Sequence, residues 1–284
     1  MYSSHMPART LARRSVTLLG ALTLISTAAP LHAQASAPAD SAPHIAVLTP
    51  RDAIVTGALA AGAAALMPFD ERIAHWMQRP SLQSNTALSD GATFFRNLGS
   101  PGTIVIGGAT YVVGRLDSSP RVEELGLRTL ESIAAGSAVG LVIKGAVGRA
   151  RPYAVGDSLP HDFHAGRGFH DDRYTSFPSG HSIAAFATAS AMSQEIRYLW
   201  PHSSPLISPA LYTGAALVGV SRLYNDDHWA SDVVAGAAVG TLAARVVVRY
   251  QRAHPNNAID RLFIGTTVVP SPSGGMALAW QRAF

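Results

Sequence analysis

Between Asp52 and Arg252 the chain alternates between six apolar stretches and polar connections. Ala, Leu and Val dominate these stretches and Gly is their main interruption, a composition typical of helices. The sequence therefore predicts an all-α domain with six helices. The predicted helices are Ala53–Phe69, Leu98–Gly114, Ser132–Ile143, Ile183–Gln194, Ala210–Val220 and Val233–Val248.

The amount of charge bears on the surroundings of these helices. Charged residues are 14% of the chain and hydrophobic residues 48%, whereas globular proteins carry about 25% charged residues. Either the surface is unusually neutral or part of it faces lipid. A membrane-spanning helix needs about 20 mostly apolar residues. Several stretches reach this length only with flanking polar residues, and Ser132–Ile143 falls short. Membrane association is the favoured interpretation, and a soluble bundle stays open.

The net charge and the cysteine content limit the classes of molecule and of chemistry that are expected for this chain. The formal net charge is +4, and Lys144 is the only lysine among 22 basic residues. This balance suits an anionic substrate or an anionic membrane surface. The arginines are scattered and no basic run is interleaved with aromatics, so nucleic acid is not an expected partner. Cysteine is absent, which excludes disulfides and thiolate catalysis. Nothing in the sequence indicates the oligomeric state.

The N-terminal 35 residues have the organisation of a secretory signal peptide. Arg9, Arg13 and Arg14 precede the uncharged stretch Val16–Ala29, and Ala33-Gln34-Ala35 follows as an A-x-A cleavage site. Residues 1–35 are therefore predicted to direct export. An uncleaved membrane anchor is the alternative interpretation.

The rest of the chain divides into three parts. Residues 36–50 are rich in Ala, Ser and Pro and are predicted to form a linker. Residues 51–252 form the helical domain, and residues 253–284 form a C-terminal tail. In the tail, Leu262–Val269 and Met276–Phe284 flank a Pro/Ser/Gly-rich segment, which indicates two short strands around a turn. The hairpin would have to dock on another element, because an isolated hairpin is marginally stable.

Two segments place chemical groups at the ends of predicted helices. Lys144 is followed seven residues later by Arg151, and Pro152 then stops the helix and restricts the backbone of Arg151. Residues 177–181, Phe-Pro-Ser-Gly-His, form a tight turn directly before the fourth helix. The free backbone N–H groups at a helix N-terminus attract anions.

A third segment supplies a histidine and a carboxylate. Ser221-Arg222 is followed by His228 and, four residues later, by Asp232. On a helix this spacing puts His228 and Asp232 on the same face, where the carboxylate can fix the imidazole tautomer.

Together the three segments can surround one tetrahedral dianion. Arg offers forked donors that match phosphate oxygens, and Lys adds a compact charge. Of the two histidines, the one backed by Asp232 can attack phosphorus, and His181 can protonate the leaving oxygen. The scheme requires neither a metal nor a cofactor, because the cations stabilise the transferring phosphoryl group.

The triple motif K-x6-R-P, P-S-G-H and S-R-x5-H-x3-D resembles the signature of the type 2 phosphatidic acid phosphatase superfamily, which also includes vanadium haloperoxidases. The resemblance covers about residues 51–252, and the sequence fills every defined position. These positions are Lys144, Arg151, Pro152, Pro178, Ser179, Gly180, His181, Ser221, Arg222, His228 and Asp232.

The resemblance implies an all-helical bundle with the site at one end. Carried over by position, His228 is the nucleophile that forms a phosphohistidine, Asp232 orients it, and His181 is the general acid. The phosphate-binding residues would be Lys144, Arg151, Ser179, Gly180 and Arg222.

Three functions compete within this superfamily. A lipid phosphate phosphatase, acting on a phosphatidate, an isoprenoid diphosphate or a lipid A phosphate, is favoured by the apolar helices. It would lie in the bacterial inner membrane with its site facing the periplasm. A soluble periplasmic acid phosphatase acting on small phosphate esters is the alternative. A vanadate-dependent haloperoxidase is disfavoured, because those enzymes are usually much longer.

Outside this signature, the polar connection Ala154–Ser176 carries His161, His164 and His170 among several aspartates. Such a long connection is usually functional or disordered. It is expected to contribute to substrate choice, and a metal-binding role is the competing hypothesis. A separate hypothesis is that the aromatic-ended tail, with Trp280 and Phe284, docks on an outer-membrane partner.

Overall fold

A computed structural model describes residues 46–255, 257–264, 266–270 and 276–280. The predicted signal peptide and all of the linker before residue 46 lie outside these residues, as does Phe284.

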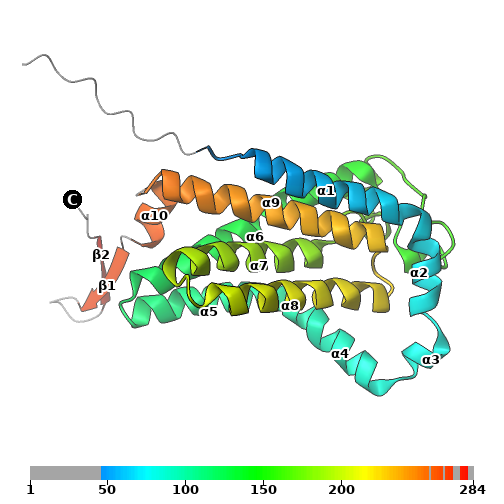
Figure 1. Cartoon of the computed structure of the whole chain (residues 1–284), viewed down its shortest axis with the longest axis horizontal. Coiled ribbons are helices and arrows are strands. Elements are labelled where there is room, and N and C mark those ends of the chain that lie inside the picture. Colours follow the sequence, from blue (N-terminus) through cyan, green and yellow to red (C-terminus); the bar gives the residue numbers. More distant parts are fainter. Residues whose placement is uncertain (1–45, 256, 265, 271–275, 281–284) are drawn as a thin grey trace, which may run out of the picture. The chain divides into compact units, whose positions relative to one another are not determined.

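Six long helices form an elongated bundle (Figure 1). The predicted all-α helical class is confirmed, and each predicted helical stretch lies largely within one of these helices. Their bounds are α1 Pro50–Leu66, α5 Thr103–Leu116, α6 Pro120–Val147, α7 Gly180–Leu199, α8 Ser204–Tyr224 and α9 Ala230–Ala253.

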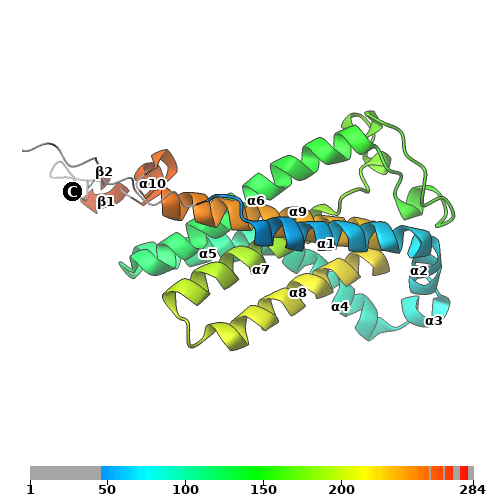
Figure 2. The ribbon, with the colours of Figure 1, turned by 45° about the horizontal axis from the view of Figure 1, so that its top comes forward.

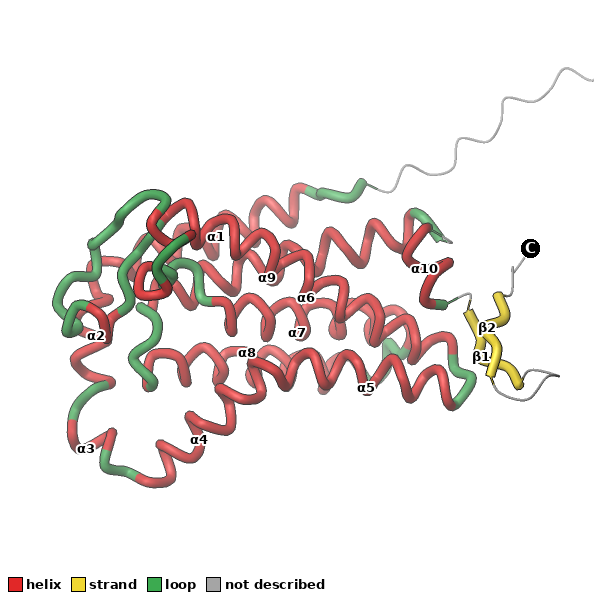
Figure 3. The backbone as a smooth tube through the Cα atoms, turned by 180° about the vertical axis from the view of Figure 1, so that it is seen from behind, coloured by secondary structure: helices red, strands yellow, loops and turns green. Residues whose placement is uncertain are grey.

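Shorter elements that the sequence did not predict connect the long helices. A run of three short helices leads from α1 to α5 and projects beyond the bundle at one end (Figure 3). These are α2 Asp70–Met77, α3 Pro80–Gln83 and α4 Thr86–Asn97; the one-turn elements are η1 Met67–Phe69, η2 Leu98–Gly102, η3 Pro152–Ala154, η4 Arg167–Phe169 and η5 Asp172–Tyr174.

Local sequence signals explain where α1 begins and where α6 ends. Thr49 caps α1 in a reciprocal capping box with Asp52, and Pro50 occupies the first helical position. At the C-terminal end of α6, Gly148 adopts a left-handed conformation (φ 60°) and its N–H donates to the Lys144 carbonyl. The chain therefore leaves α6 one turn after Lys144.

The packing of α7 against α9 depends on small residues. A Cβ atom added at Gly236 would lie 2.5 Å from the Ser179 carbonyl oxygen, and one at Gly240 would lie 2.3 Å from the Ile183 carbonyl oxygen. The two glycines are one helical turn apart and let the α9 backbone approach α7 closely. This approach sets the position of the N-terminal end of α7 relative to that of α9.

Within the described residues, four segments are long and apolar enough to cross a membrane by length and composition: Pro50–Met77, Pro120–Val147, Ser204–Tyr224 and Ala230–Ala253. The expectation that the third predicted helix, Ser132–Ile143, is too short was wrong, because α6 continues through a polar N-terminal half. Large apolar side chains also remain exposed on the bundle, including Leu141 (67%), Val105 (62%) and Leu206 (82%).

The tail contains a helix and two paired strands. After α10 (Ala258–Phe263), β1 (Thr266–Pro270) and β2 (Met276–Trp280) form an antiparallel pair, with Thr266 opposite Trp280. The predicted pair of strands is present, but its first strand is shorter than expected. Leu262 and Phe263 belong to α10, which Asn257 caps by accepting from the Ile259 and Asp260 N–H groups.

Candidate active site

The candidate site residues come from four helix ends and lie at the same end of the bundle. Lys144 comes from the last turn of α6, His181 from the first turn of α7, and Arg222 from the last turn of α8. His228 lies just before α9, and Asp232 lies in its first turn. Side chains that are up to 88 residues apart in sequence therefore meet because four helix ends meet.

Two arginines share one counter-ion at this end. Arg151 Nη1 lies 3.3 Å from Asp227 Oδ1, and Arg222 Nη2 donates to Asp227 Oδ2. Arg151 also donates to the Thr175 hydroxyl at 3.0 Å, while Lys144 donates to the Thr175 carbonyl. Three cations are thus held together with one carboxylate between them, which leaves a net positive site.

Arg222 has donors to spare. Its residue is 4% exposed, yet Nε and Nη1 have no hydrogen-bond partner among the residues that the structure describes. A buried donor without a partner is destabilising unless a ligand or water satisfies it. The guanidinium therefore presents unused N–H groups suited to phosphate oxygens.

The start of α7 supplies further donors. Ser179 is the N-cap, and its Oγ accepts from the Ser182 N–H at 3.4 Å and from the Ser182 hydroxyl at 3.0 Å. Both contacts use Ser179 Oγ as the acceptor, so its own hydroxyl hydrogen can donate. Gly180 lies next to Lys144, because a Cβ added there would be 3.6 Å from Lys144 Cε. A helix N-terminus and a lysine thus point to the same anion position.

The hydrogen bonding of His228 defines its tautomer. Its Nδ1 lies 2.7 Å from the Ser176 carbonyl oxygen, which can only accept, so Nδ1 carries the hydrogen. Burial lowers the pKa of His228 well below its usual 6.5, and the charges of Lys144, Arg151 and Arg222 lower it further. At neutral pH the ring is therefore uncharged, with a free lone pair on Nε2.

The expected relation of Asp232 to His228 was wrong in detail. His228 precedes α9 and does not share a helix face with Asp232, and its Nδ1 is 3.9 Å from Asp232 Oδ2. Asp232 acts through Ser176 instead: the Ser176 hydroxyl donates to Asp232 at 2.5 Å, while the Ser176 carbonyl accepts from His228. Asp232 also accepts from the Trp229 N–H at 2.9 Å, which fixes the first turn of α9.

Arg149, to which the sequence analysis gave no role, holds this arrangement from behind. It is completely buried and donates to Asp232 at 2.5 Å, to Asp70 at 2.8 Å and to Ser231 at 2.7 Å. Its remaining donors bind the Pro160 carbonyl, so all five N–H groups are used. The Gly-Arg-Ala-Arg-Pro run contains Arg149, but no local pattern marks Asp70 of α2 as its partner.

The loop after α8 adds a protonated carboxyl. Burial raises the pKa of Asp226 to about 8, and a hydrogen bond with Asp157 and the negative charges of Asp157 and Asp227 add to the effect. At neutral pH this group is therefore uncharged and does not reduce the positive charge around Arg222.

The polar connection between α6 and α7 places Thr175 and Ser176 at the site. Its histidines do not form a metal site: in the described part of the chain no group of three or more His, Asp or Glu side chains is arranged to hold an ion. His164 instead lies 2.8 Å from Asp162 and packs edge-on against Tyr174.

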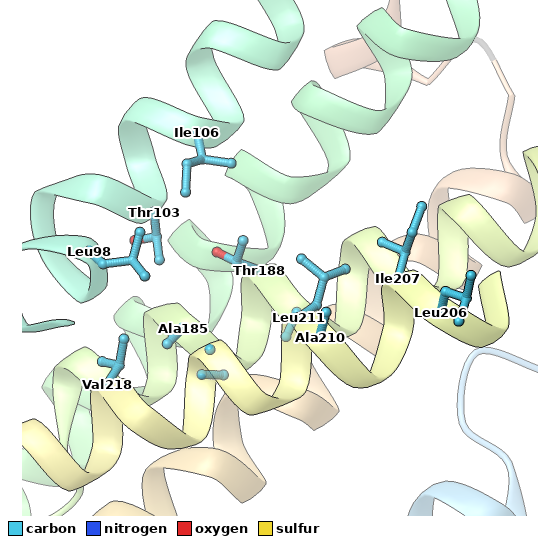
Figure 4. A pocket seen from close by; sticks show the side chains of 13 residues that line it. Leu98, Thr103, Ile106, Ala185, Thr188, Leu206, Ile207, Ala210, Leu211 and Val218 are labelled. Carbon is cyan, nitrogen blue, oxygen red and sulfur yellow. The ribbon is translucent and has the colours of Figure 1, made fainter. Parts of the chain in front are cut away.

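Two of the cavities in the described part of the chain differ in their lining. One, of about 270 Å³, is lined by Lys144, Gly180 and His181 together with apolar residues of α5, α6 and α7. The other, of about 430 Å³, lies between α5, α7 and α8, and Val218, Leu211 and Ile106 are among its side chains (Figure 4). Its lining has no titratable group. Of these two cavities, only the first combines apolar walls with titratable side chains.

Comparisons with known proteins agree with this geometry. Residues 125–255 match the model of the PAP2 superfamily. The chain is 38% identical over 109 residues to a lipid A 1-phosphatase of Porphyromonas gingivalis, an alignment covering 38% of this chain and 22% of that protein. The chain thus spans about a fifth of the length of that relative.

The fold also matches a solved structure. A transmembrane PAP2 type phosphatidylglycerolphosphate phosphatase from Bacillus subtilis superposes with a TM-score of 0.50 at 23% identity, over 72% of this chain and 96% of that one. The family match contains Lys144, Asp232 and every candidate site residue between them. The comparisons thus relate residues 125–255 of the chain to the PAP2 superfamily.

Proposed function

We propose that this protein is a metal-independent phosphatase that acts on a phosphorylated lipid through a phosphohistidine intermediate. The observation that carries the proposal is the neutral His228 ring, hydrogen-bonded through Nδ1 and surrounded by three cations. A neutral imidazole with a free Nε2 is a nucleophile, and the cations around it can bind the phosphoryl group that it attacks.

In the first step, His228 Nε2 forms a bond to phosphorus as the bond from phosphorus to the leaving oxygen breaks. The leaving oxygen takes a proton from His181. Burial and the charges of Arg222, Lys144 and Arg151 lower the pKa of His181 to about 4 in the empty site, so in this proposal the negative charge of the bound phosphate raises it again and His181 enters the step as the imidazolium. Arg151, Arg222, Lys144 and the start of α7 stabilise the equatorial oxygens. The Ser176 carbonyl stabilises the positive charge that develops on the His228 ring, and Asp232 does so from 3.9 Å.

In the second step, neutral His181 removes a proton from water, and the resulting oxygen attacks phosphorus. The bond from phosphorus to Nε2 breaks, the electron pair returns to His228, and inorganic phosphate leaves. His181 is protonated again and ready for the next substrate. Each histidine thus ends the cycle in the state in which it began.

The lining of the 270 Å³ cavity favours a lipid over a small phosphate ester. Lys144 and His181 lie in the same cavity as Ile104, Ile133 and Leu141, so a phosphate group and an apolar chain can bind side by side. The similarity to a lipid A 1-phosphatase supports the same substrate class.

The four apolar segments and the exposed apolar side chains support a placement in the membrane. In this proposal the protein lies in the bacterial inner membrane.

The test is phosphate release by the purified full chain from a lipid phosphate and from a water-soluble phosphate ester, with excess chelator. We expect chelator-resistant release from the lipid that His228→Ala abolishes and that the exposed control His202→Ala leaves unchanged. Equal activity on the soluble ester would favour a broad-specificity acid phosphatase, and chelator-sensitive activity would refute the metal-independent mechanism.

A further inference from the structure

A second polar cavity lies at the end of the bundle remote from the candidate active site. It has a volume of about 890 Å³ and is bordered by the first turns of α1, the second half of α7 and the last turns of α9. Figure 2 shows α1 lying along α9, and these two helices form one side of the cavity. Arg252 follows Asp232 by 20 residues on α9, which corresponds to about 30 Å along the helix.

Five arginines line this cavity, which we call the arginine cleft: Arg51, Arg197, Arg245, Arg249 and Arg252. They come from three helices that are distant in sequence, so their convergence is a property of the fold. Arginines that serve only as charged residues at helix ends need not share a cavity. Arg121, at the start of α6, is an example: it is exposed and lies outside the cleft.

Carboxylates neutralise only part of this charge. Asp52 pairs with Arg245 at 3.0 Å and with Arg249, and Glu195 pairs with Arg252 at 3.2 Å. Glu195 is also shared with Arg128, at 3.0 Å, outside the cleft. Two carboxylates therefore pair with three arginines of the cleft, and one of these carboxylates is also shared with Arg128.

The other two arginines are unpaired in the part of the chain that the structure describes. Arg51 and Arg197 are exposed and lie within ion-pair distance of no described carboxylate. Arg252 lies over the Tyr198 ring at 4.2 Å, which keeps its guanidinium at the cleft wall, and its buried Nε has no partner among the described residues. The cleft thus has an excess of positive charge and unused donors.

The rest of the lining indicates what kind of anion the cleft would take. Val55, Leu59 and Phe186 continue the wall toward the middle of the bundle. Arg51 lies at the start of one candidate membrane span and Arg252 near the end of another. If these two segments span a bilayer, the arginines lie at headgroup depth and the apolar wall lies at the depth of the acyl chains. The distance of about 30 Å from the catalytic end equals the thickness of a bilayer core.

We propose that the arginine cleft binds the headgroup of an anionic phospholipid in the leaflet opposite the catalytic site. The phosphate would lie between Arg51, Arg197 and Arg252, and an acyl chain would lie along Phe186 and Leu59. Basic pockets between membrane helices bind anionic headgroups in this way. The inference rests on the proposed membrane placement but not on the phosphatase reaction.

The experiment uses the full chain in a nonionic detergent and carries His228→Ala throughout, so that no lipid is consumed. Native mass spectrometry measures the dissociation constants of phosphatidylglycerol and phosphatidylcholine, and thermal unfolding with each lipid provides a second readout. We expect phosphatidylglycerol to bind about tenfold more tightly, since charge-assisted contacts to arginine add to those of the chains. The double variant Arg51→Gln/Arg197→Gln should lose most of that preference.

The matched control is Arg72→Gln/Arg121→Gln, which removes two exposed arginines outside the cleft and should retain the preference. Equal loss in both double variants, or equal binding of the two lipids, would overturn the proposal. Inorganic phosphate that protected as well as phosphatidylglycerol at the same concentration would show a soluble-anion site and would also overturn it. Absence of phosphatase activity in the chain without His228→Ala would refute the proposed function and leave this comparison unchanged.

Discussion

Arg149 and Arg222 are both buried arginines next to the candidate active site, and they use their donors in opposite ways. Arg149 is completely buried and all five of its N–H groups bind protein acceptors. Arg222 is 4% exposed and leaves Nε and Nη1 without a partner in the described chain. An arginine whose donors all bind protein acceptors can only hold its neighbours in place, whereas an arginine with unused donors can bind a ligand.

This difference separates a supporting layer from a binding layer. Asp70, Ser231, Asp232 and Ser176 belong with Arg149 and are 0% exposed, so they form a closed polar network behind His228. Such a network is stable only when every member is satisfied. Lys144, Arg151 and Arg222 form the binding layer, which is completed by substrate. Substitutions in the two layers should therefore change different kinetic and thermodynamic quantities.

The largest predicted effect belongs to His181→Ala, at the general acid that works beside the binding layer. General-acid catalysis contributes about 10²–10⁴-fold, and the contribution is largest for poor leaving groups. We expect kcat to fall by about that factor with an alkyl phosphate and far less with nitrophenyl phosphate. Steady-state kinetics with the two esters provide the check, and equal losses with both would contradict the general-acid role.

Breaking the supporting layer with Arg149→Ala should reduce both stability and kcat. The substitution leaves Asp70 and Asp232 buried without their cation, which costs about 3–5 kcal/mol of unfolding free energy. In the protein that remains folded we expect kcat to fall about 100-fold with KM nearly unchanged, because the nucleophile is misplaced while the phosphate site is intact.

Chemical rescue distinguishes positioning from simple structural damage. Added guanidinium should restore part of the kcat of Arg149→Ala and should not restore that of Arg149→Lys, whose side chain fills the space. A rise in KM with kcat unchanged would place Arg149 in the binding layer and contradict the comparison.

Arg222→Lys sharpens the comparison from the binding side. Lysine keeps the charge but not the planar fork, so the contacts made by Nε and Nη1 are lost. We expect KM for the phosphate substrate to rise about tenfold, equivalent to about 1.4 kcal/mol, with little change in the melting temperature. A large loss of stability without a change in KM would show that Arg222 is structural.

The smallest effect is expected from Asp226→Asn. The unfolded chain releases this proton near pH 3.8 and the native chain near pH 8, so between these values the native state binds more protons. Asp226 therefore makes the wild type less stable as pH rises from 4 to 8. Asn should gain about 1 kcal/mol at pH 8, less than the full shift implies because solvent screens a partly exposed group. Melting curves from pH 5 to 9 should show the gain growing and then levelling; a constant gain would contradict the assignment.

The sequence predicted the middle of each long helix because apolar composition is a local property. It underestimated α6, whose N-terminal half carries Glu123, Arg128 and other charged residues. Those charges are accommodated by partners on other helices: Arg128 reaches Glu195 of α7, and Glu123 reaches Arg115 of α5. Tertiary ion pairs of this kind leave no trace in local periodicity. The helices α2 and α4 were missed for a different reason, because they are short and polar.

The site was predictable where its residues occur in short motifs with fixed spacing. The structure brings Lys144, Arg151, His181, Arg222 and His228 to one end of the bundle, as the motifs indicated, although their roles stay predictions. Ser176 and Asp70 were not predictable, because each acts on a residue more than 50 positions away. The supporting layer depends on contacts that only the fold creates, whereas the residues of the binding layer belong to the sequence motifs and could be predicted from them.

The central claim is that His228 becomes phosphorylated during turnover. Mixing His181→Ala with nitrophenyl phosphate, which needs little acid assistance, should allow the first step and slow the second. A quench in alkaline denaturant preserves phosphohistidine, and peptide mass spectrometry then locates the phosphate. The account predicts phosphate on His228 in a substantial fraction of the chains; a phosphate-free protein under active turnover, or phosphate on another residue, would contradict it.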